Sequence, residues 1–149
     1  MKIYLDLCVY NRPFDDQSQP RILIETIQSL FLLEKAVNKE IALINSFVLE
    51  EENRRNPFIH RKDKIEDLLN LASEYVGYSK KIENRATEIE NFGIMALDAL
   101  HITCAEFAKA DFFVTCDDLL VRRGKSLKGK LKVRIIGLIE FVTKEVFKI

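Results

Sequence analysis

Residues 96–120 are ALDALHITCAEFAKADFFVTCDDLL, a stretch that joins a helical pattern, a short apolar run and two adjacent aspartates. Its first part repeats apolar residues at helical spacing, and we expect that face to lie against the core. The residues of this face are Leu97, Leu100, Cys104 and Phe107. Residues 111–115, DFFVT, form an apolar run typical of a strand buried on both sides. A helix that leads directly into such a strand indicates an α/β fold with a parallel sheet.

The same alternation of patterns extends outward from this stretch. Residues 2–9, KIYLDLCV, predict a strand in which Asp6 is the only strongly polar residue. Two more strands are expected over IALI (41–44) and KVRII (132–136). The other helical patterns run from Pro20 through Leu23, Ile27, Leu30 and Val37; from Asn45 or Ser46 to Asn56; from Ile65 through Leu69 and Ala72 to Val76; and from Ile82 to Gly93. We therefore predict an α/β fold, a three-layer αβα sandwich around a short, mostly parallel sheet of about four to five strands.

Length and composition set the expected class of protein. The chain has 149 residues, of which 48% are hydrophobic and 31% charged, so we expect a single domain over residues 1–149. The three cysteines are odd in number and far apart, which is typical of buried thiols in a reducing compartment. No apolar run approaches the ~20 residues that span a bilayer, and the first residues do not resemble a signal peptide. We expect a cytoplasmic protein with no membrane segment.

The charges are balanced overall but unevenly placed. The chain has 23 basic and 23 acidic residues, which argues against a general nucleic-acid binder with a basic excess. Residues 122–134, RRGKSLKGKLKVR, nevertheless contain only basic charges. This segment could follow a phosphate backbone, and the residues we assign to RNA are Arg122, Arg123, Lys125 and Lys128.

Several acids lie where parallel sheets bind ligands, at the carboxyl ends of strands and the starts of helices. Asp6 lies in the first strand and Asp117 directly follows the strand over 111–115. Asp98 lies near the start of an apolar helix, and Glu50–Glu52 lie in the helix after the second strand. Each also has a structural interpretation: Asp6 could cap the next loop, Asp117 could cap the next helix, and the glutamates could form a solvated face.

If three or four of these carboxylates converge, they need a cation. At ~4 Å and an effective dielectric constant near 20, each like-charged pair repels by ~4 kcal/mol. Mg²⁺ or Mn²⁺ would relieve this repulsion, because hard cations prefer oxygen ligands. Such a site is suited to phosphodiester hydrolysis.

Three segments of the chain together resemble the PIN-domain family, which includes VapC-like ribonuclease toxins. KIYLDLCVYNRPF resembles the family's opening strand, which ends in a metal-binding Asp and so places that role on Asp6. ALDALHITCAEFAKADFFVTCDDLL resembles its most distinctive stretch and places the next metal-binding acids on Asp98 and Asp117, with Thr115 as the accompanying hydroxyl. The resemblance covers nearly the whole chain and implies a PIN-like sandwich.

The third segment, LINSFVLEEENRRNPF, resembles the family's strand and Ser or Thr followed some six residues later by a catalytic Glu. Counting from Ser46 gives Glu52, while Glu51 and Glu50 stay open as alternatives. Asn11 in NRPFDD also resembles a feature of one branch of the family, and we expect it near the site as a phosphate or water ligand.

The resemblance implies a Mg²⁺- or Mn²⁺-dependent endoribonuclease that acts on single-stranded or structured RNA. It also implies the toxin of a type II toxin–antitoxin pair, with an antitoxin protein as partner and a homodimer as assembly. One alternative is a non-catalytic PIN-like module that binds RNA or protein, and a weaker one is an α/β hydrolase of small nucleotides. His101 is expected to be a hydrogen-bonded helix histidine rather than half of a soft-metal pair with Cys104.

Overall fold

A computed structural model describes residues 1–148 of the chain, and its centre is one five-stranded parallel sheet. The strand order is β3-β2-β1-β4-β5, so the first strand lies in the middle. The strands are β1 (Lys2–Leu5), β2 (Ala42–Ser46), β3 (Glu74–Val76), β4 (Phe112–Thr115) and β5 (Arg134–Gly137). Every strand pair in this sheet is parallel, which confirms the predicted α/β class and sheet.

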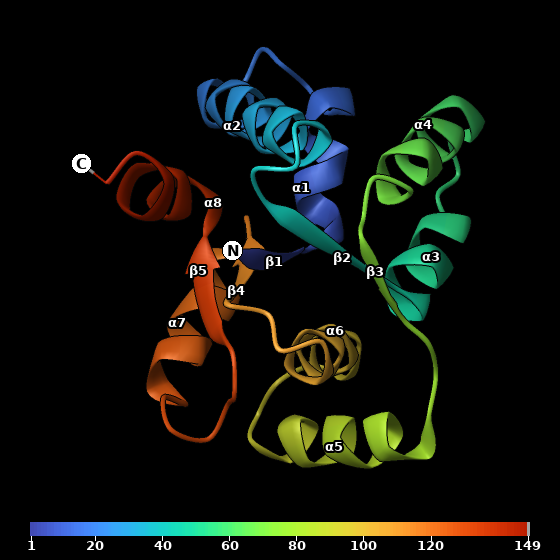
Figure 1. The fold of residues 1–149 in the computed structure, drawn as a ribbon, viewed down its shortest axis with the longest axis vertical. Coiled ribbons are helices and arrows are strands. Elements are labelled where there is room, and N and C mark those ends of the chain that lie inside the picture. The colour runs from blue at the N-terminus through green and yellow to red at the C-terminus, as the bar shows by residue number, and fades with distance from the viewer. Residues whose placement is uncertain (149) are drawn as a thin grey trace.

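Helices cover both faces of the sheet, as predicted. In Figure 1, α1, α2 and α8 lie on one side of the sheet and α5 and α6 on the other. The helices are α1 (Leu7–Asn11), the 3₁₀ turn η1 (Arg12–Phe14), α2 (Pro20–Val37), α3 (Phe47–Arg54), α4 (Ile59–Leu69), α5 (Lys80–Asn91), α6 (Ala96–Phe107), α7 (Asp118–Ser126), α8 (Leu138–Glu140) and the π-helical turn η2 (Phe141–Val146). This arrangement is the three-layer sandwich expected from the sequence.

The position of β1 determines where the polar residues meet. Ile3, Tyr4 and Leu5 are fully buried, because neighbouring strands flank β1 and helices cover both of its faces. In a parallel sheet all carboxyl ends lie at one edge. The residues at the carboxyl ends of β1, β2 and β4 therefore lie side by side: Asp6 and Thr115 are hydrogen-bonded although 109 positions separate them in the sequence.

Two predicted elements differ from the structure. The strand expected over residues 2–9 ends at Leu5, because the Asp6 side chain accepts a hydrogen bond from the backbone N–H of Leu7 and begins α1. The helix expected from Ile65 to Val76 ends at Leu69, and Glu74–Val76 instead form the edge strand β3 beside β2. A strand of three residues is too short to show a period of two.

The predicted inner face of α6 is only partly correct. Cys104 is buried and Leu100 is half-buried, but Leu97 and Phe107 are exposed. The buried side of α6 consists mainly of small and polar residues: Ala99, His101, Ile102, Thr103, Cys104, Ala105 and Glu106. Small side chains let α6 approach its neighbours closely, so the largest apolar residues of the helix do not mark its inner face.

Within residues 1–148, no helix combines the length and apolar character needed to cross a lipid bilayer.

Candidate metal centre

Asp6 lies at the carboxyl end of the central strand, and both of its oxygens are held in place. Its Oδ1 accepts the backbone N–H of Leu7 at 2.9 Å, and its Oδ2 accepts the hydroxyl of Thr115 at 2.8 Å. Thr115 is the last residue of the neighbouring strand β4, and its Oγ1 also accepts the backbone N–H of Asp117 at 3.1 Å. The alternative interpretation of Asp6 as a cap holds, except that Asp6 caps helix α1 and not a loop. The same contacts orient its carboxylate at the sheet edge.

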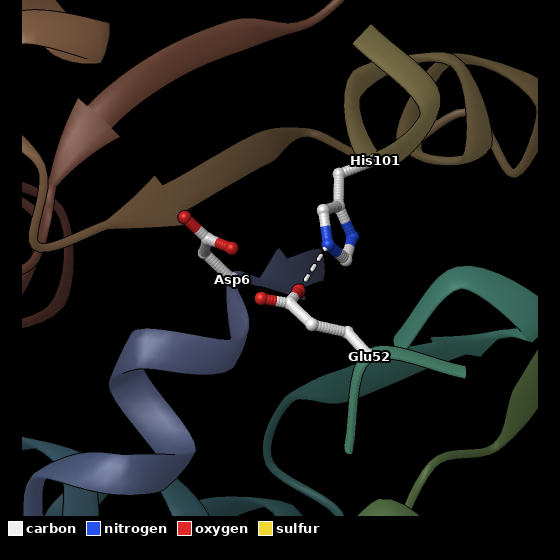
Figure 2. A group of neighbouring side chains, drawn as sticks. All are labelled: Asp6, Glu52 and His101. Atoms are coloured by element: carbon white, nitrogen blue, oxygen red, sulfur yellow. Dashed lines mark hydrogen bonds and ion pairs between the residues drawn. The ribbon is translucent and has the colours of Figure 1, made fainter. Parts of the chain in front are cut away.

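Glu52 is the glutamate that lies beside Asp6. Its Oε1 is 2.7 Å from Nε2 of His101, and the ligand atoms of Asp6, Glu52 and His101 all lie within 4.8 Å of one another. In Figure 2 these three side chains point toward one another from α3, α6 and the junction of β1 with α1. Ser46 orients α3 by accepting the backbone N–H of Leu49, as predicted for this cap.

The neighbouring glutamates are engaged elsewhere. Glu50 accepts a hydrogen bond from the Asn45 side chain at 3.0 Å, and Glu51 pairs with Arg54 at 2.9 Å on the surface. Of the three open choices, Glu52 is the one that the structure brings to Asp6.

Asp98 lies in the first turn of α6 and is half-buried. The pKa of its carboxyl group is raised from 3.8 to about 6, first by burial and next by the negative charge of Asp6. His101 opposes this rise, while the charges of Asp117 and Glu52 add to it. Asp98 therefore lies in the electrostatic field of the same acids, although a separation of up to 92 positions hides this in the sequence.

Asp117 begins α7, and its Oδ1 accepts the backbone N–H groups of Leu119 and Leu120 at 3.0 and 3.2 Å. The interpretation as a helix cap is thus confirmed. It is compatible with a place at the site, because the pKa of Asp98 also reflects the charge of Asp117. The group whose ligand atoms all lie within 4.8 Å of one another is Asp6, Glu52 and His101, and it includes neither Asp98 nor the exposed Asp117. Asp98 and Asp117 lie near this group, because the charges of Asp6, Glu52 and Asp117 all raise the pKa of Asp98. We call Asp6, Glu52, Asp98 and Asp117 the carboxylate cluster.

The carboxylate cluster lacks the lysine and arginine partners that the buried acids Glu25 and Glu106 have. Glu25 is bound by Arg12 at 3.0 Å, and Glu106 by Arg85 at 2.8 Å. In the described part of the chain, by contrast, no member of the carboxylate cluster forms an ion pair with a lysine or arginine. Asp6 and Glu52, whose ligand atoms lie within 4.8 Å of each other, repel one another when both are ionised, and a proton or a cation would relieve this repulsion.

A chain of buried hydrogen bonds through Ser46, Tyr4 and His101 ends at Glu52. Tyr4 Oη lies 2.7 Å from both Ser46 Oγ and His101 Nδ1. With Glu52 ionised and the imidazole neutral, Nε2–H of His101 donates to Glu52 and Nδ1 accepts from the Tyr4 hydroxyl. The prediction of a hydrogen-bonded histidine is confirmed. Its link to Glu52 was not predicted, although the spacing of three residues already places Asp98 and His101 on one face of a helix.

Three other predicted site residues, Asn11, Arg122 and Arg123, lie outside the carboxylate cluster. Asn11 ends α1, half-buried, and its Oδ1 has no hydrogen-bond partner within residues 1–148. Arg122 lies close enough to lower the pKa of Asp118, and Arg123 donates to the Gly93 carbonyl at 3.0 Å.

Of the other two basic residues assigned to RNA, Lys125 lies in the last turn of α7 and Lys128 follows the helix, which ends at Ser126. Lys125 and Lys128 line a pocket of about 610 Å³ beside β5, which contains no member of the carboxylate cluster. Because a helix rises 1.5 Å per residue, Lys125 lies roughly 12 Å along the axis from Asp117.

Comparison with known proteins shows a likeness to solved structures. No family model matches the chain, and no curated protein does. The chain is similar to a chain in the crystal structure of VapBC2 from Rickettsia felis bound to a DNA fragment from their promoter. The TM-score is 0.54 at 16% identity, and the match covers 92% of this chain and 98% of that chain. At this level of identity the likeness supports the expected PIN-like fold and carries no residue-level information.

Proposed function

We propose that this chain is a Mg²⁺- or Mn²⁺-dependent endoribonuclease formed by a single PIN-like domain over residues 1–149. One observation supports the proposal most: Asp6 and Glu52, from separate elements, have ligand atoms within 4.8 Å of each other without a lysine or arginine partner in the described chain, and their charges act on Asp98. A protein gains nothing in stability from such repulsion. The arrangement is explained if the acids bind a divalent cation.

The donor atoms fit such an ion. Hard cations select carboxylate oxygens, and Asp6, Asp98 and Asp117 would hold the ion, with Glu52 beside them. When bound, Mg²⁺ or Mn²⁺ would activate a water and neutralise charge on the attacked phosphate. Thr115 would keep Asp6 oriented, as its 2.8 Å hydrogen bond to Oδ2 indicates.

Glu52 has a different role in this proposal. Its Oε1 is bound to His101, while its second oxygen has no hydrogen-bond partner among the described residues. That second oxygen could accept the proton of an attacking water as a general base. His101 would hold the carboxylate in the orientation that this step needs.

The substrate and partner belong to the same proposal. Arg122, Arg123, Lys125 and Lys128 would bind the phosphate backbone of single-stranded or structured RNA, and Asn11 would bind a phosphate or water near the carboxylate cluster. The fold shared with a chain of the VapBC2 structure supports a toxin of a toxin–antitoxin pair, with an antitoxin protein as partner.

Cleavage of a labelled single-stranded RNA tests the proposal. Wild-type protein should cut it in Mn²⁺ or Mg²⁺ and not in EDTA, and Asp6→Asn should be inactive. Asp63→Asn is the matched control, because Asp63 is an exposed acid of α4 without a side-chain partner within residues 1–148. Cleavage that survives both EDTA and Asp6→Asn would refute the assigned site. Mn²⁺ binding without cleavage would instead favour a non-catalytic PIN-like module, an alternative that the net charge of +0 supports.

Two substitutions of His101 separate its contacts, because asparagine mimics Nδ1 and glutamine mimics Nε2. His101→Asn should keep a partner for Tyr4 but lose Glu52, and kcat should fall about 10- to 100-fold. His101→Gln should keep the Glu52 contact and retain most of the activity. The measurements are kcat at saturating Mn²⁺ and the thermal midpoint of each variant. Equal kcat in both variants, with equal losses of stability, would show that His101 does not position Glu52.

A further inference from the structure

Tyr78 is an exposed aromatic residue in the segment that leads from the edge strand β3 to α5 (Figure 1). Its ring lies edge to face against the ring of Phe47, with centroids 5.9 Å apart, yet 64% of its surface is exposed. Its hydroxyl donates a hydrogen bond to Glu83 of α5. These two contacts hold the ring in place and leave most of its surface free to contact another molecule.

The register of the sheet places Tyr78 on the same edge as the candidate metal centre. The parallel pairing of β1 with β2 brings Asp6 level with Ser46, and Ser46 in turn pairs with Val76 of β3. Because neighbouring strands lie about 4.8 Å apart, Val76 is roughly 10 Å from Asp6. Tyr78 follows two residues later, beyond the carboxyl end of β3. A ligand with a phosphate at the carboxylate cluster therefore reaches the Tyr78 ring if it extends along this edge.

Two lysines follow Tyr78 closely in the sequence. Lys80 and Lys81 are both exposed in the first turn of α5. Lys80 lies 3.4 Å from Glu83, whereas Lys81 forms no ion pair within residues 1–148 and is a free positive charge. An exposed ring beside positive charge is the combination that binds single-stranded nucleic acid, because the ring stacks on a base while the cation attracts the phosphates.

We propose that Tyr78 binds an unpaired base of the RNA substrate by stacking on it, a few nucleotides from the phosphate at the carboxylate cluster. This inference rests on the proposed ribonuclease function and adds a residue that selects single-stranded RNA. In a duplex the bases stack on one another, so their faces are not available to the ring. At about 3.4 Å per stacked nucleotide, the separation of roughly 10 Å between Asp6 and the end of β3 corresponds to about three nucleotides.

Binding of RNA without cleavage tests the role of Tyr78. Every protein carries Glu52→Gln, which removes the proposed general base and leaves Asp6, Asp98 and Asp117 to bind Mn²⁺. Fluorescence anisotropy then gives the Kd of a labelled single strand and of the same strand in a duplex. Tyr78→Leu keeps an apolar cover on Phe47 but lacks a ring, and it should raise the single-strand Kd about 5- to 150-fold. Tyr78→Phe keeps the ring and should bind like the parent, and neither variant should change the duplex Kd.

Tyr75→Leu is the matched control, because Tyr75 is also an exposed tyrosine but lies within β3, about 10 Å before Tyr78 along the chain. It should bind both RNAs like the parent. An unchanged single-strand Kd in Tyr78→Leu, or an equal loss of duplex binding, would overturn the role of Tyr78 and leave the ribonuclease proposal standing. A parent protein that binds neither RNA would overturn both proposals. The thermal midpoint of each variant shows whether a loss of binding reflects a loss of fold.

Photo-cross-linking locates the stacked base directly and needs no substitution at position 78. A single-stranded oligonucleotide with one 5-iodouridine is irradiated in complex with the Glu52→Gln protein, and fragmentation mass spectrometry identifies the attached residue. We expect attachment to Tyr78, strongest when the 5-iodouridine lies about three nucleotides from the bond that wild-type protein cleaves. Attachment to Tyr75 in place of Tyr78, or no attachment at any position of the 5-iodouridine, would contradict stacking on Tyr78.

Discussion

Asp98→Asn is expected to lower the rate of metal-dependent RNA cleavage by about 1000-fold, because a carboxylate that binds the ion supplies several kcal/mol of charge stabilisation. Asparagine has nearly the same shape and keeps a carbonyl oxygen, so the helix start should be unaffected. The loss should appear mainly in kcat and in Mn²⁺ affinity. Asp63→Asn should retain wild-type activity. Activity of Asp98→Asn within a few-fold of wild type would remove Asp98 from the site.

The raised pKa of Asp98 gives this variant a second signature. Because the pKa of Asp98 is about 6 in the folded state, folding favours the protonated form of this carboxyl group. The stability that protonated Asp98 contributes is fully present below the unfolded-state pKa of about 3.9, and it is lost as the pH rises through about 6. Without metal at pH 8, Asp98→Asn should therefore be more stable than wild type. Because protons and metal compete for this carboxylate, wild-type Mn²⁺ affinity should also fall below about pH 6.

Arg12→Met should destabilise the fold by about 3–5 kcal/mol, the usual cost of leaving a buried charge without its partner. Arg12 binds Glu25 at 3.0 Å and Asp15 at 2.8 Å, and the Glu25 side chain is only 1% exposed. Arg21 is 3.5 Å from Glu25, half-exposed and shared with Asp118, so it cannot replace Arg12. Urea unfolding in EDTA measures the loss without any contribution from metal.

Two further variants test whether the loss of stability comes from the ion pair between Arg12 and Glu25. Lys35→Met removes the surface pair with Glu40 and should change the free energy of unfolding by less than about 1 kcal/mol. The double variant Arg12→Met with Glu25→Met should recover much of the lost stability, because it removes both buried charges. A loss below 1 kcal/mol in Arg12→Met alone would show that Glu25 does not depend on Arg12.

Most of the parallel sheet could be predicted because strands such as β1 and β4 are buried on both faces, whereas the edge strand β3 is not and was missed. The runs over residues 2–5 and 111–115 are almost wholly apolar, and buried parallel strands have this composition. The helix that begins at Leu7 could not be predicted, since LDLCV fits a period of two as well as one turn of helix. Its start depends on one hydrogen bond from Leu7 to Asp6.

Helical spacing showed which residues share one face of a helix, but not whether that face points toward the core or toward solvent. On α2 the spacing of Leu23, Ile27 and Leu30 describes the face that is exposed, because polar contacts made by Glu25 and Ser29 decide which face lies inward. Those contacts join residues 13 and 20 positions apart, which no local pattern shows.

The candidate site could be predicted only in part, because some of its contacts join residues that are distant in the sequence. The ends of strands located Asp6 and Asp117, the start of an apolar helix located Asp98, and the resemblance suggested their roles and the count that gave Glu52. The Tyr4–His101–Glu52 chain was not predictable, because it joins residues 49 and 97 positions apart. It exists only once β1, α3 and α6 are packed.

The central claim is that the carboxylate cluster binds a divalent cation, and a crystal soaked in Mn²⁺ tests it most directly. Anomalous scattering locates manganese independently of the protein atoms. We expect a peak in direct contact with carboxylate oxygens of Asp6 and Asp98, and with Asp117 or Glu52 completing the site. Absence of a peak at saturating Mn²⁺, with these acids free of any cation, would contradict the account.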